Sequence, residues 1–332
     1  MLIDSSGRAI NYLRVSITDR CNLRCLYCMP PEGVKWKPHN DILSFEEIIR
    51  IAKIMTYLGI RNIRITGGEP LLRRGMIFLI KELKSIKGIE KITLTTNGLL
   101  LGAYLNEAGS MGLPDGINIS LDALDNECYK KMTGSGFLHE CKNAEPAAIV
   151  PLIDRLLEKK ITVKINCVPV RASGKPCNEK EIVPIAALAK DRNIFVRFIE
   201  LMPLGSASVF QSVPGEEAAA QIENFFGILK PAGDIYGSGP AVYYSLPGFT
   251  GKIGFINAVT HIFCETCNRL RLTSEGSLRL CLSDEHGLDL RALIRAGAGD
   301  DEIIKEITEA VKLKPRSHAF KNNKEGMSEI GG

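Results

Sequence analysis

Three cysteines near the N-terminus have the spacing that most clearly indicates chemistry. Cys21, Cys25 and Cys28 form a C-x3-C-x2-C pattern, and the aromatic residue Tyr27 comes directly before the last cysteine. A structural zinc site closes its coordination shell with four ligands, whereas three thiolates suit a cubane iron–sulfur cluster that leaves one iron open to a further ligand. The pattern therefore predicts a [4Fe–4S] cluster with an open iron, and the alternative is a zinc knuckle.

A second group of three cysteines lies near the other end of the chain. Cys264, Cys267 and Cys281 form a C-x2-C-x13-C pattern. A lone C-x2-C pair would fit zinc or a redox pair equally well. A second set of three in a chain that already has one set is more restrictive, and it predicts a second cluster with an open iron.

Two arginines follow the second of these cysteines, within the run Asn-Arg-Leu-Arg at 268–271. On an extended segment, Arg269 and Arg271 point to the same side because strand side chains alternate. Next to an anionic substrate they would be bidentate hydrogen-bond donors. The alternative is a solvated charged surface, which is where most arginines are found.

The bulk composition excludes several classes of protein. The chain of 332 residues is 45% hydrophobic and 24% charged, which is ordinary for a globular protein. No run approaches the ~18 apolar residues of a membrane helix, and the N-terminus lacks a signal pattern, so we expect a cytoplasmic protein with no membrane partner. A net charge of +4 is too small to indicate nucleic-acid binding. Disulfides are rare in the cytosol, so the grouped cysteines indicate metal binding or catalysis.

Strand and helix patterns alternate through the first two-thirds of the chain. Strands are expected at 12–17, 63–66, 92–96, 116–120, 161–167 and 195–199, and helices at about 44–57, 76–86, 147–159 and 179–191, with another ending near 111. The stretch from about 132 to 146 is predicted to be a loop. Six such units predict an α/β fold, an incomplete (β/α)6 TIM-like barrel with a parallel sheet. The unusual residues directly follow strands, so they should converge on one mouth of the barrel.

The character of the sequence changes after about residue 205. Residues 1–205 are expected to form the partial barrel with the first cluster. Residues 206–332 contain frequent glycine and proline, the second cysteine group, a final helix at about 300–313 and a terminal Gly331-Gly332 pair. We expect this second region to close the barrel mouth.

The first cysteine motif resembles that of the radical S-adenosylmethionine superfamily, whose signature is C-x3-C-x-aromatic-C. The run Gly67-Gly68-Glu69-Pro70, directly after the second expected strand, resembles the GGEP motif of the same superfamily. The resemblance implies that the open iron chelates the amino and carboxylate groups of S-adenosyl-L-methionine. Cleavage of the sulfonium then yields a 5′-deoxyadenosyl radical. It also implies contacts with this cofactor from Tyr27, Gly68, Ser120 and Met202. The alternatives are a simple tight turn for the glycine pair and core packing for Met202.

The chain as a whole resembles the GTP 3′,8-cyclase family, the molybdenum cofactor biosynthesis protein A enzymes. The resemblance rests on both cysteine groups, the segments 65–71, 95–98, 120–123, 196–200 and 267–272, and the terminal glycine pair. It implies two [4Fe–4S] clusters, and GTP as a substrate whose ribose C3′ loses a hydrogen and bonds to guanine C8. The product would be 3′,8-cyclo-7,8-dihydro-GTP. The stretch 134–146 diverges from the expected pattern.

The family resemblance also assigns individual residues. The positions that match GTP-binding residues are Arg14, Arg64, Thr95, Lys164, Arg269, Leu270 and Arg271. Catalytic roles are implied for Arg269, Arg271, Gly331 and Gly332, the last two because a tail without side chains can enter a narrow channel. A lone surface charge is not expected within an apolar strand, so the positions of Arg14 and Arg64 favour ligand binding.

The resemblance implies partners as well. They are GTP, a reductant protein such as flavodoxin or ferredoxin, and cyclic pyranopterin monophosphate synthase, which takes the product; the chain would be a monomer or homodimer that binds no nucleic acid. One alternative is another radical enzyme with two clusters, such as a peptide-modifying type. Others are a family member that binds GTP without turnover, and a zinc-dependent nucleic-acid-binding protein.

Overall fold

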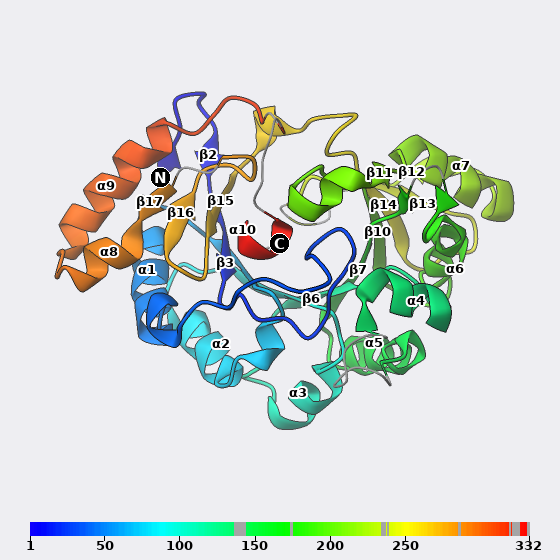
Figure 1. Ribbon diagram of the computed structural model, residues 1–332, viewed down its shortest axis with the longest axis horizontal. Helices are drawn as coiled ribbons and strands as arrows, with labels where there is room; N and C mark the ends of the chain where they lie inside the picture. Colours follow the sequence, from blue (N-terminus) through cyan, green and yellow to red (C-terminus); the bar gives the residue numbers. More distant parts are fainter. Residues whose placement is uncertain are drawn as a thin grey trace.

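A single sheet of twelve strands curves through the computed structural model of the chain and is open at its two ends (Figure 1). The structure describes residues 1–135, 144–172, 175–233, 237, 239–284, 287–318, 320 and 326–330. The strand order is β12-β13-β14-β10-β7-β6-β5-β4-β3-β15-β16-β17. The pairings from β14 through to β15 are all parallel, and the outer strands add in antiparallel fashion.

The six strands expected from the sequence form the middle of this sheet. They are β3 (Tyr12–Ser16), β4 (Asn62–Thr66), β5 (Lys91–Thr96), β6 (Gly116–Ser120), β7 (Thr162–Cys167) and β10 (Phe195–Ile199). The α/β class and the incomplete, TIM-like barrel are therefore confirmed.

The C-terminal region adds one parallel strand to each side of the six. These strands are β14 (Lys252–Ile256), beside β10, and β15 (Arg269–Leu272), beside β3. The alternation of strand and helix patterns does not predict β14 and β15 in these positions. The reason is that each of them pairs with a strand that is distant in the sequence. The other strands of the sheet are β12 (Lys230–Pro231), β13 (Val242–Ser245), β16 (Ser277–Arg279) and β17 (Gly287–Asp289). Short ribbons outside it contain β1 (Leu2–Ile3), β2 (Ala9–Ile10), β8 (Val170–Ala172), β9 (Lys175–Pro176) and β11 (Gln211–Ser212).

The helices lie around the convex side of the sheet (Figure 1). They are α1 (Phe45–Tyr57), α2 (Met76–Ser85), α3 (Leu101–Glu107), α4 (Asn126–Thr133), α5 (Val150–Glu158), α6 (Ile182–Ala187), α7 (Gly215–Phe226), α8 (Leu290–Arg295) and α9 (Asp300–Lys312). A last short helix, α10 (Met327–Ile330), lies instead within the concave side. The described residues contain no helix that is long and apolar enough to cross a membrane.

Local sequence explains where α1 begins. The Ser44 hydroxyl accepts from the Glu47 backbone N–H at 3.1 Å, and the Glu47 carboxylate accepts from the Ser44 N–H at 2.7 Å. This capping box satisfies two backbone donors that have no partner inside the helix. The helix then buries Ile48, Ile51 and Met55 against the sheet.

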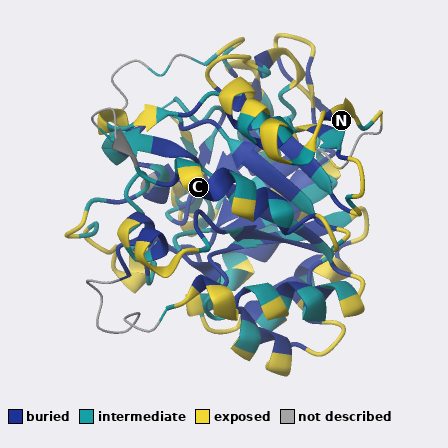
Figure 2. Ribbon diagram, turned by 90° about the vertical axis from the view of Figure 1, so that its right-hand side faces the viewer, coloured by how far each residue is buried: buried dark blue, intermediate teal, exposed yellow. Residues whose placement is uncertain are grey.

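Alternation along the strands gives the sheet two different faces. Residues such as Leu13, Ile63, Leu94 and Val196 point to the helices and are fully or almost fully buried in the core. Figure 2 shows these buried strands inside a shell of partly exposed helices. In an eight-stranded barrel the interior is filled by bulky apolar side chains. Here the concave face has polar side chains at the intervening positions, so it lines a cavity and not a second core.

Four helices were not expected from the sequence, namely α4, α7, α8 and α10. In α4, Asp125 accepts from the Cys128 backbone N–H at 2.9 Å, but the helix buries few apolar residues, so its periodicity is weak. Helix α7 lies in a stretch of frequent glycine and proline, and begins after Pro214. The expected loop at about 132–146 overlaps the end of α4, and much of the remainder, 136–143, lies outside the described residues.

Candidate active site

The concave face of the sheet encloses a cavity of about 300 Å³ that both cysteine groups line. The structure brings together most of the site residues expected from the sequence on its wall: Arg14, Cys21, Cys25, Tyr27, Cys28, Arg64, Gly68, Thr95, Ser120, Met202, Cys264, Cys267, Arg269, Arg271 and Cys281. They come from strands, from loops that follow strands and from the C-terminal region. Residues as distant in the sequence as Arg14 and Cys281 therefore share one site.

Of the other four expected residues, two have different positions and two are not described. Lys164 lines a smaller cavity that adjoins the main one. Leu270 is fully buried in the core, because its neighbours Arg269 and Arg271 point into the cavity and the strand alternates. Its side chain therefore has no direct access to a ligand in the cavity. Gly331 and Gly332 lie outside the described residues.

The N-terminal cysteine loop lies at the carboxyl end of β3. Its turn is fixed by the backbone N–H groups of Cys28 and Met29, which donate to the Cys25 carbonyl at 2.9 and 3.1 Å. Burial, the neighbouring Cys21 thiol and Asp122 raise the pKa of Cys28 to about 12. Burial likewise raises the pKa of Cys25, with Asp122 and the other two thiols adding to it. Burial thus keeps the Cys25 and Cys28 thiols protonated on their own, and a positively charged metal centre, which deprotonates a coordinating thiol, would offset this burial.

Tyr27 connects this loop to the carboxyl end of β6. Its hydroxyl donates to the Asp122 carboxylate at 2.6 Å, and that carboxylate also accepts from the Val168 N–H at 2.8 Å. Burial raises the pKa of Asp122 to about 6, although both hydrogen bonds oppose the rise. The side chain of Tyr27 thus ties the cysteine loop to the strand ends, and its backbone is left to contact a cofactor in the cavity.

The Gly67-Gly68 pair packs against the cysteine loop. A Cβ on Gly68 would lie 2.3 Å from the Arg20 carbonyl oxygen, and one on Gly67 would lie 2.7 Å from the Thr18 oxygen. The Gly68 N–H donates to Thr18 at 2.7 Å. Glycine is therefore required at both positions because the backbone of the cysteine loop packs directly against them.

Glu69 fixes the same turn from inside the protein. Its fully buried carboxylate accepts from the N–H of Asn97 at 2.7 Å, the hydroxyl of Thr96 at 2.8 Å and the N–H of Leu71 at 3.0 Å. Burial raises the pKa of Glu69 to about 7 in spite of these hydrogen bonds. The side chain joins the ends of β4 and β5 at the wall of the cavity.

The C-terminal cysteines face the first group from the other side of the cavity. Cys264 and Cys267 flank a short 3-10 turn before β15, and Cys281 follows β16. Burial alone would raise the pKa of Cys267, but Arg269 and Lys314 outweigh it and lower this pKa. The second site is thus more electropositive than the first, which suits both a thiolate-bound cluster and an anionic ligand.

Three arginines form a row across neighbouring strands. Arg271 on β15 pairs with Arg14 on β3, and Arg14 pairs with Arg64 on β4. Burial and the charges of Arg271 and Arg64 hold the pKa of Arg14 well below its usual range. Burial and Arg269 lower the pKa of Arg271 to about 10. Such a concentration of buried like charges is costly without an anion to neutralise it.

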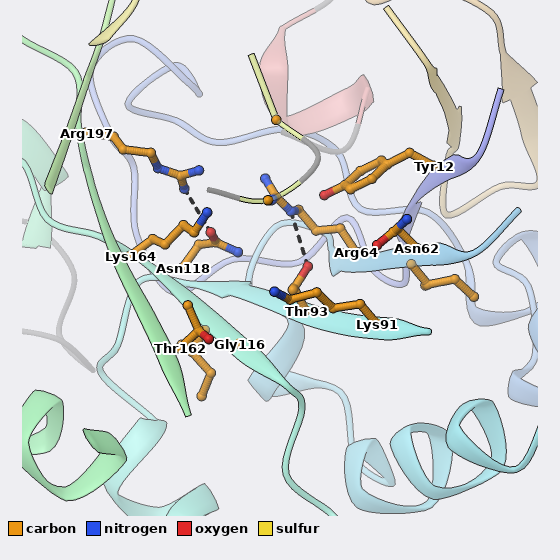
Figure 3. A pocket seen from close by; sticks show the side chains of 14 residues that line it. Tyr12, Asn62, Arg64, Lys91, Thr93, Gly116, Asn118, Thr162, Lys164 and Arg197 are labelled. Atoms are coloured by element: carbon orange, nitrogen blue, oxygen red, sulfur yellow. Dashed lines mark hydrogen bonds between the residues drawn. The ribbon is translucent and has the colours of Figure 1, made fainter. Parts of the chain in front are cut away.

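A smaller cavity continues from this row toward the amino ends of the strands (Figure 3). Lys164 and Arg197 enter it from β7 and β10, and Arg64 enters it from β4. Burial, together with Arg197 and Arg64, lowers the pKa of Lys164 to about 7. Tyr12 and Asn118 supply further polar lining.

Arg197 is a candidate that the sequence reasoning missed. It is only 3% exposed, and its guanidinium donates to Asn166 at 2.9 Å and Asn118 at 2.8 Å. Burial lowers its pKa to about 10. Its signal was the same one that singled out Arg14 and Arg64, a lone arginine inside an apolar strand.

Several buried polar atoms on the cavity wall lack a hydrogen-bond partner among the described residues. They include Thr95 Oγ1, Arg271 Nη1 and the Tyr12 hydroxyl. Buried polar groups are nearly always paired in folded proteins. Orphaned donors and acceptors that face one cavity therefore indicate that a polar ligand completes them.

Comparison with known proteins shows the family. The Radical SAM superfamily matches residues 15–193, and the family described as Molybdenum Cofactor Synthesis C matches residues 194–320. GTP 3′,8-cyclase of Desulforamulus reducens is 42% identical over 338 residues, and that of Petrotoga mobilis is 43% identical over 339 residues. Each alignment covers 100% of this chain and 100% of the relative. The chain belongs to the GTP 3′,8-cyclase family.

Solved structures of more distant proteins agree with the fold of this cyclase family member. The structure of Streptococcus suis SuiB bound to S-adenosylmethionine has a TM-score of 0.58 at 15% identity, and covers 90% of this chain and 68% of that chain. A second SuiB structure has a TM-score of 0.59 at 13% identity and covers 96% of this chain and 68% of that one. At such identities the likeness is one of fold alone.

The residues present fit the cofactors of GTP 3′,8-cyclases, which are two [4Fe–4S] clusters and S-adenosyl-L-methionine. Each cysteine group offers three thiols to the cavity, so each would leave one iron open. The described residues contain no three His, Cys, Asp or Glu side chains grouped closely enough to hold one metal ion. A cubane is larger than one ion, so ligands set further apart suit it.

Proposed function

We propose that the chain converts GTP to (8S)-3′,8-cyclo-7,8-dihydroguanosine 5′-triphosphate, the first step of molybdenum cofactor biosynthesis. The observation that carries the proposal is that two three-cysteine sites and a row of three arginines line one cavity. The family of the chain supports it independently. The enzyme would be a lyase.

The N-terminal site is assigned to radical formation. Cys21, Cys25 and Cys28 would hold a cluster with S-adenosyl-L-methionine on its open iron, and the pair supplies a 5′-deoxyadenosyl radical that removes a hydrogen atom. We assign contacts with this cofactor to Tyr27, Gly68, Ser120 and Met202, which line the same cavity. The Tyr27–Asp122 hydrogen bond and the Gly68 contact hold the loop in place.

GTP would span the two cavities. The guanine base is assigned to the C-terminal site, near Cys264, Cys267 and Cys281. The triphosphate is assigned to the smaller cavity, where Arg64, Lys164 and Arg197 present cations within a largely buried space. Fixed cations cost no reorganisation when the anion arrives, so the binding energy is retained. This placement leaves the ribose between the two cysteine sites.

The remaining residues would orient the nucleotide. Thr95 Oγ1 is a buried oxygen without a hydrogen-bond partner among the described residues, and we assign it a contact with the ribose. Arg14 belongs to the row of arginines that lines the same cavity. Arg269 and Arg271 lie beside the second cysteine site, where they would stabilise negative charge. Removal of the C3′ hydrogen lets C3′ bond to guanine C8, and one electron and one proton then complete the dihydro product. Leu270 supports this strand from the core and is not assigned a contact.

The chain end and the partners complete the proposal. Helix α10 places Met327 on the cavity wall, and Gly331 and Gly332 follow this helix in the sequence. We assign them an auxiliary catalytic role. We assign radical formation to residues 1–205 and the second cluster to residues 206–332, with contacts to GTP from both regions. A flavodoxin or ferredoxin would supply electrons in the cytoplasm, and cyclic pyranopterin monophosphate synthase would consume the product; the chain would act as a monomer or homodimer.

Separate loss of the two sites tests the proposal. Cys25→Ala is expected to abolish cleavage of S-adenosyl-L-methionine, because the radical source is lost. Cys267→Ala is expected to leave the first cluster and uncoupled cofactor cleavage, but to stop formation of the cyclised nucleotide. Anaerobic assays would follow both products by chromatography. Normal cyclisation in Cys267→Ala would contradict the assignment of the second site.

A further inference from the structure

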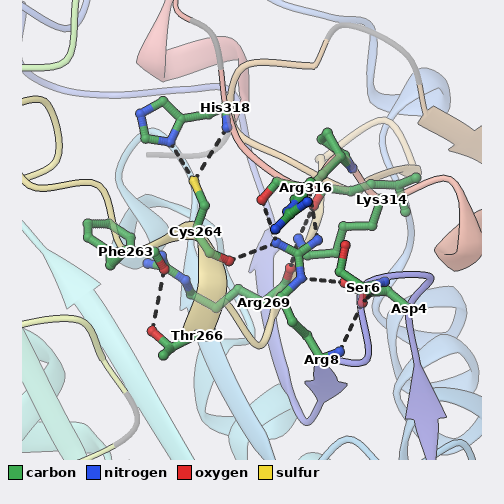
Figure 4. A network of polar contacts seen from close by, with 12 residues as sticks. Asp4, Ser6, Arg8, Phe263, Cys264, Thr266, Arg269, Lys314, Arg316 and His318 are labelled. Atoms are coloured by element: carbon green, nitrogen blue, oxygen red, sulfur yellow. Dashed lines mark hydrogen bonds and ion pairs between the residues drawn. The ribbon is translucent and has the colours of Figure 1, made fainter.

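The segment 314–318 crosses directly behind the C-terminal cysteine site (Figure 4). It follows α9 and leads toward α10 in the barrel mouth. Neither the resemblance nor the cavity residues assigned above give this segment a role. Its polar side chains nevertheless contact every part of the chain that carries a C-terminal cysteine.

Lys314 bridges two of these parts. It is only 4% exposed, and its ammonium donates to the backbone carbonyl of Arg269 at 2.9 Å and also to that of Leu280. Arg269 lies two residues after Cys267, and Leu280 directly precedes Cys281. Burying an ammonium is costly unless it is paired. The two carbonyls, and a negatively charged thiolate site beside them, offset that cost.

His318 contacts the third cysteine. Its Nδ1 lies 2.9 Å from the Cys264 sulfur, and its backbone N–H donates to the same sulfur at 3.4 Å. With the proton on Nδ1, the ring also donates. Hydrogen bonds to ligand sulfurs stabilise the reduced state of an iron–sulfur cluster and so raise its reduction potential.

Arg8 holds the segment to the rest of the protein. Its guanidinium donates to the carbonyls of Cys264 at 2.7 Å and Pro315 at 2.7 Å, and Asp4 accepts from its Nε at 2.6 Å. The side chain is 8% exposed. The N-terminal turn therefore fixes both the cysteine loop and the segment behind it.

We propose that Lys314 and His318 are positioning residues of the C-terminal cysteine site. Lys314 holds the segments of Cys267 and Cys281 at the separation that a cluster needs, and His318 sets the electron affinity of the cluster through the Cys264 sulfur. The inference rests on the proposed function only in that this site holds a cluster.

The test uses a parent protein in which Cys21, Cys25 and Cys28 are all alanine, so that only the C-terminal site can hold a cluster. After anaerobic reconstitution, the parent is expected to contain about four iron atoms per chain. Lys314→Met in this parent should lower the iron content, or speed the loss of iron to a chelator by about 10–100-fold. Lys314→Arg, which keeps a donating cation, should recover part of the retention.

Lys312→Met is the matched control. This lysine lies two positions earlier, is exposed and pairs only with Glu309 on the surface of α9 among the described residues. Thermal unfolding of the iron-free proteins shows whether a variant has simply failed to fold. Iron retention in a folded Lys314→Met equal to that in Lys312→Met would overturn the role of Lys314. A parent without iron would overturn the proposed second cluster, and this inference with it.

The role of His318 has its own readout. In the same parent, His318→Phe removes the ring donor and keeps an aromatic ring, so iron content should be retained and the midpoint potential of the cluster should become more negative. His318→Asn restores a donor and should return the potential toward that of the parent. Potentials are measured by redox titration with electron paramagnetic resonance. An unchanged potential in His318→Phe would remove His318 from the proposal.

Discussion

At the scale of single residues, the main feature of the cavity is a group of arginines that lie close together on its wall. Arg14, Arg64 and Arg271 lie side by side on three strands, and burial together with the charges of Arg271 and Arg64 lowers the pKa of Arg14. Retaining such a set costs stability, unless an anion offsets the repulsion when it binds. The residue types predicted an anionic substrate, but the sequence could not show that Arg197 joins them, because a single internal arginine has several other possible partners.

Removal of one arginine beside the second cysteine site should weaken GTP binding. Arg269→Ala or Arg271→Ala is expected to cost about 1.5–3 kcal/mol of binding free energy, the scale of a hydrogen bond to a charged group. Isothermal titration under anaerobic conditions would measure the affinity. Cofactor cleavage without GTP should be unchanged, since the N-terminal site is untouched. Wild-type affinity in both variants would return these arginines to a purely structural role.

Lys164 should make GTP binding depend on pH. Burial and nearby arginines lower its pKa to about 7 in the free protein, and a bound triphosphate would raise this pKa again. Above pH 7 binding must therefore take up a proton, so affinity should fall by up to about tenfold per pH unit until the raised pKa is reached. Below pH 7 the lysine is already charged and this dependence disappears. Affinity measured from pH 6 to 9 gives the slope.

A pair of variants tests this assignment. Lys164→Met should bind GTP more weakly at pH 7 and should lose the slope between pH 7 and 9. Lys159→Met, an exposed lysine at the end of α5, should keep the wild-type slope. The same slope in Lys164→Met as in the wild type would assign the dependence to another group.

At the scale of elements, the ends of neighbouring strands hold one another in register. The turn after β4 fits against the cysteine loop after β3, and Glu69 then ties that turn to the end of β5. The sequence predicted the order of these strands well, because alternating buried residues and turn residues are local signals. It could not predict β14 and β15, since nothing local to residues 252–256 or 269–272 indicates which strand they will pair with. Nor could it show that Gly68 packs on Arg20.

Replacing Gly68 should disturb the first cysteine loop. In Gly68→Ala the new methyl group would lie 2.3 Å from a backbone oxygen, so one of the two loops must move. We expect a loss of about 1–3 kcal/mol of stability from this overpacking, with weaker cofactor cleavage. Gly299→Ala is the control, because nothing lies within 4 Å of the added atom there. If Gly68→Ala has the same thermal stability and the same rate of cofactor cleavage as Gly299→Ala, the two loops can move apart without cost and the expectation is wrong.

At the scale of the whole molecule, the two ends of the chain meet around one site. Strand β15 lies parallel to β3, so Arg269 is aligned with Tyr12, and Arg8 at the N-terminus holds residues 315 and 316 near the C-terminus. A radical reaction needs its substrate enclosed, because water and other molecules would intercept the reactive species. The open sheet alone leaves the mouth uncovered, and α10 lies within that mouth. Closure of the barrel mouth therefore depends on the C-terminal region, which lies outside the six strand and helix units of the barrel.

The last residues should matter for catalysis more than for folding. Helix α10 buries Ile330 almost completely and places Met327 on the cavity wall, and the two terminal glycines follow this helix in the sequence. Chain ends are usually dispensable, yet residues without side chains can enter a space where any Cβ would clash. Deletion of Gly331 and Gly332 is expected to leave thermal stability, iron content and GTP affinity near wild type, but to suppress the cyclised nucleotide. Product yield is compared at matched iron content, with Gly332→Ala as a variant of full length. If the truncated protein forms product as fast as the full chain, the catalytic role of the tail is lost, and enclosure by α10 alone is sufficient.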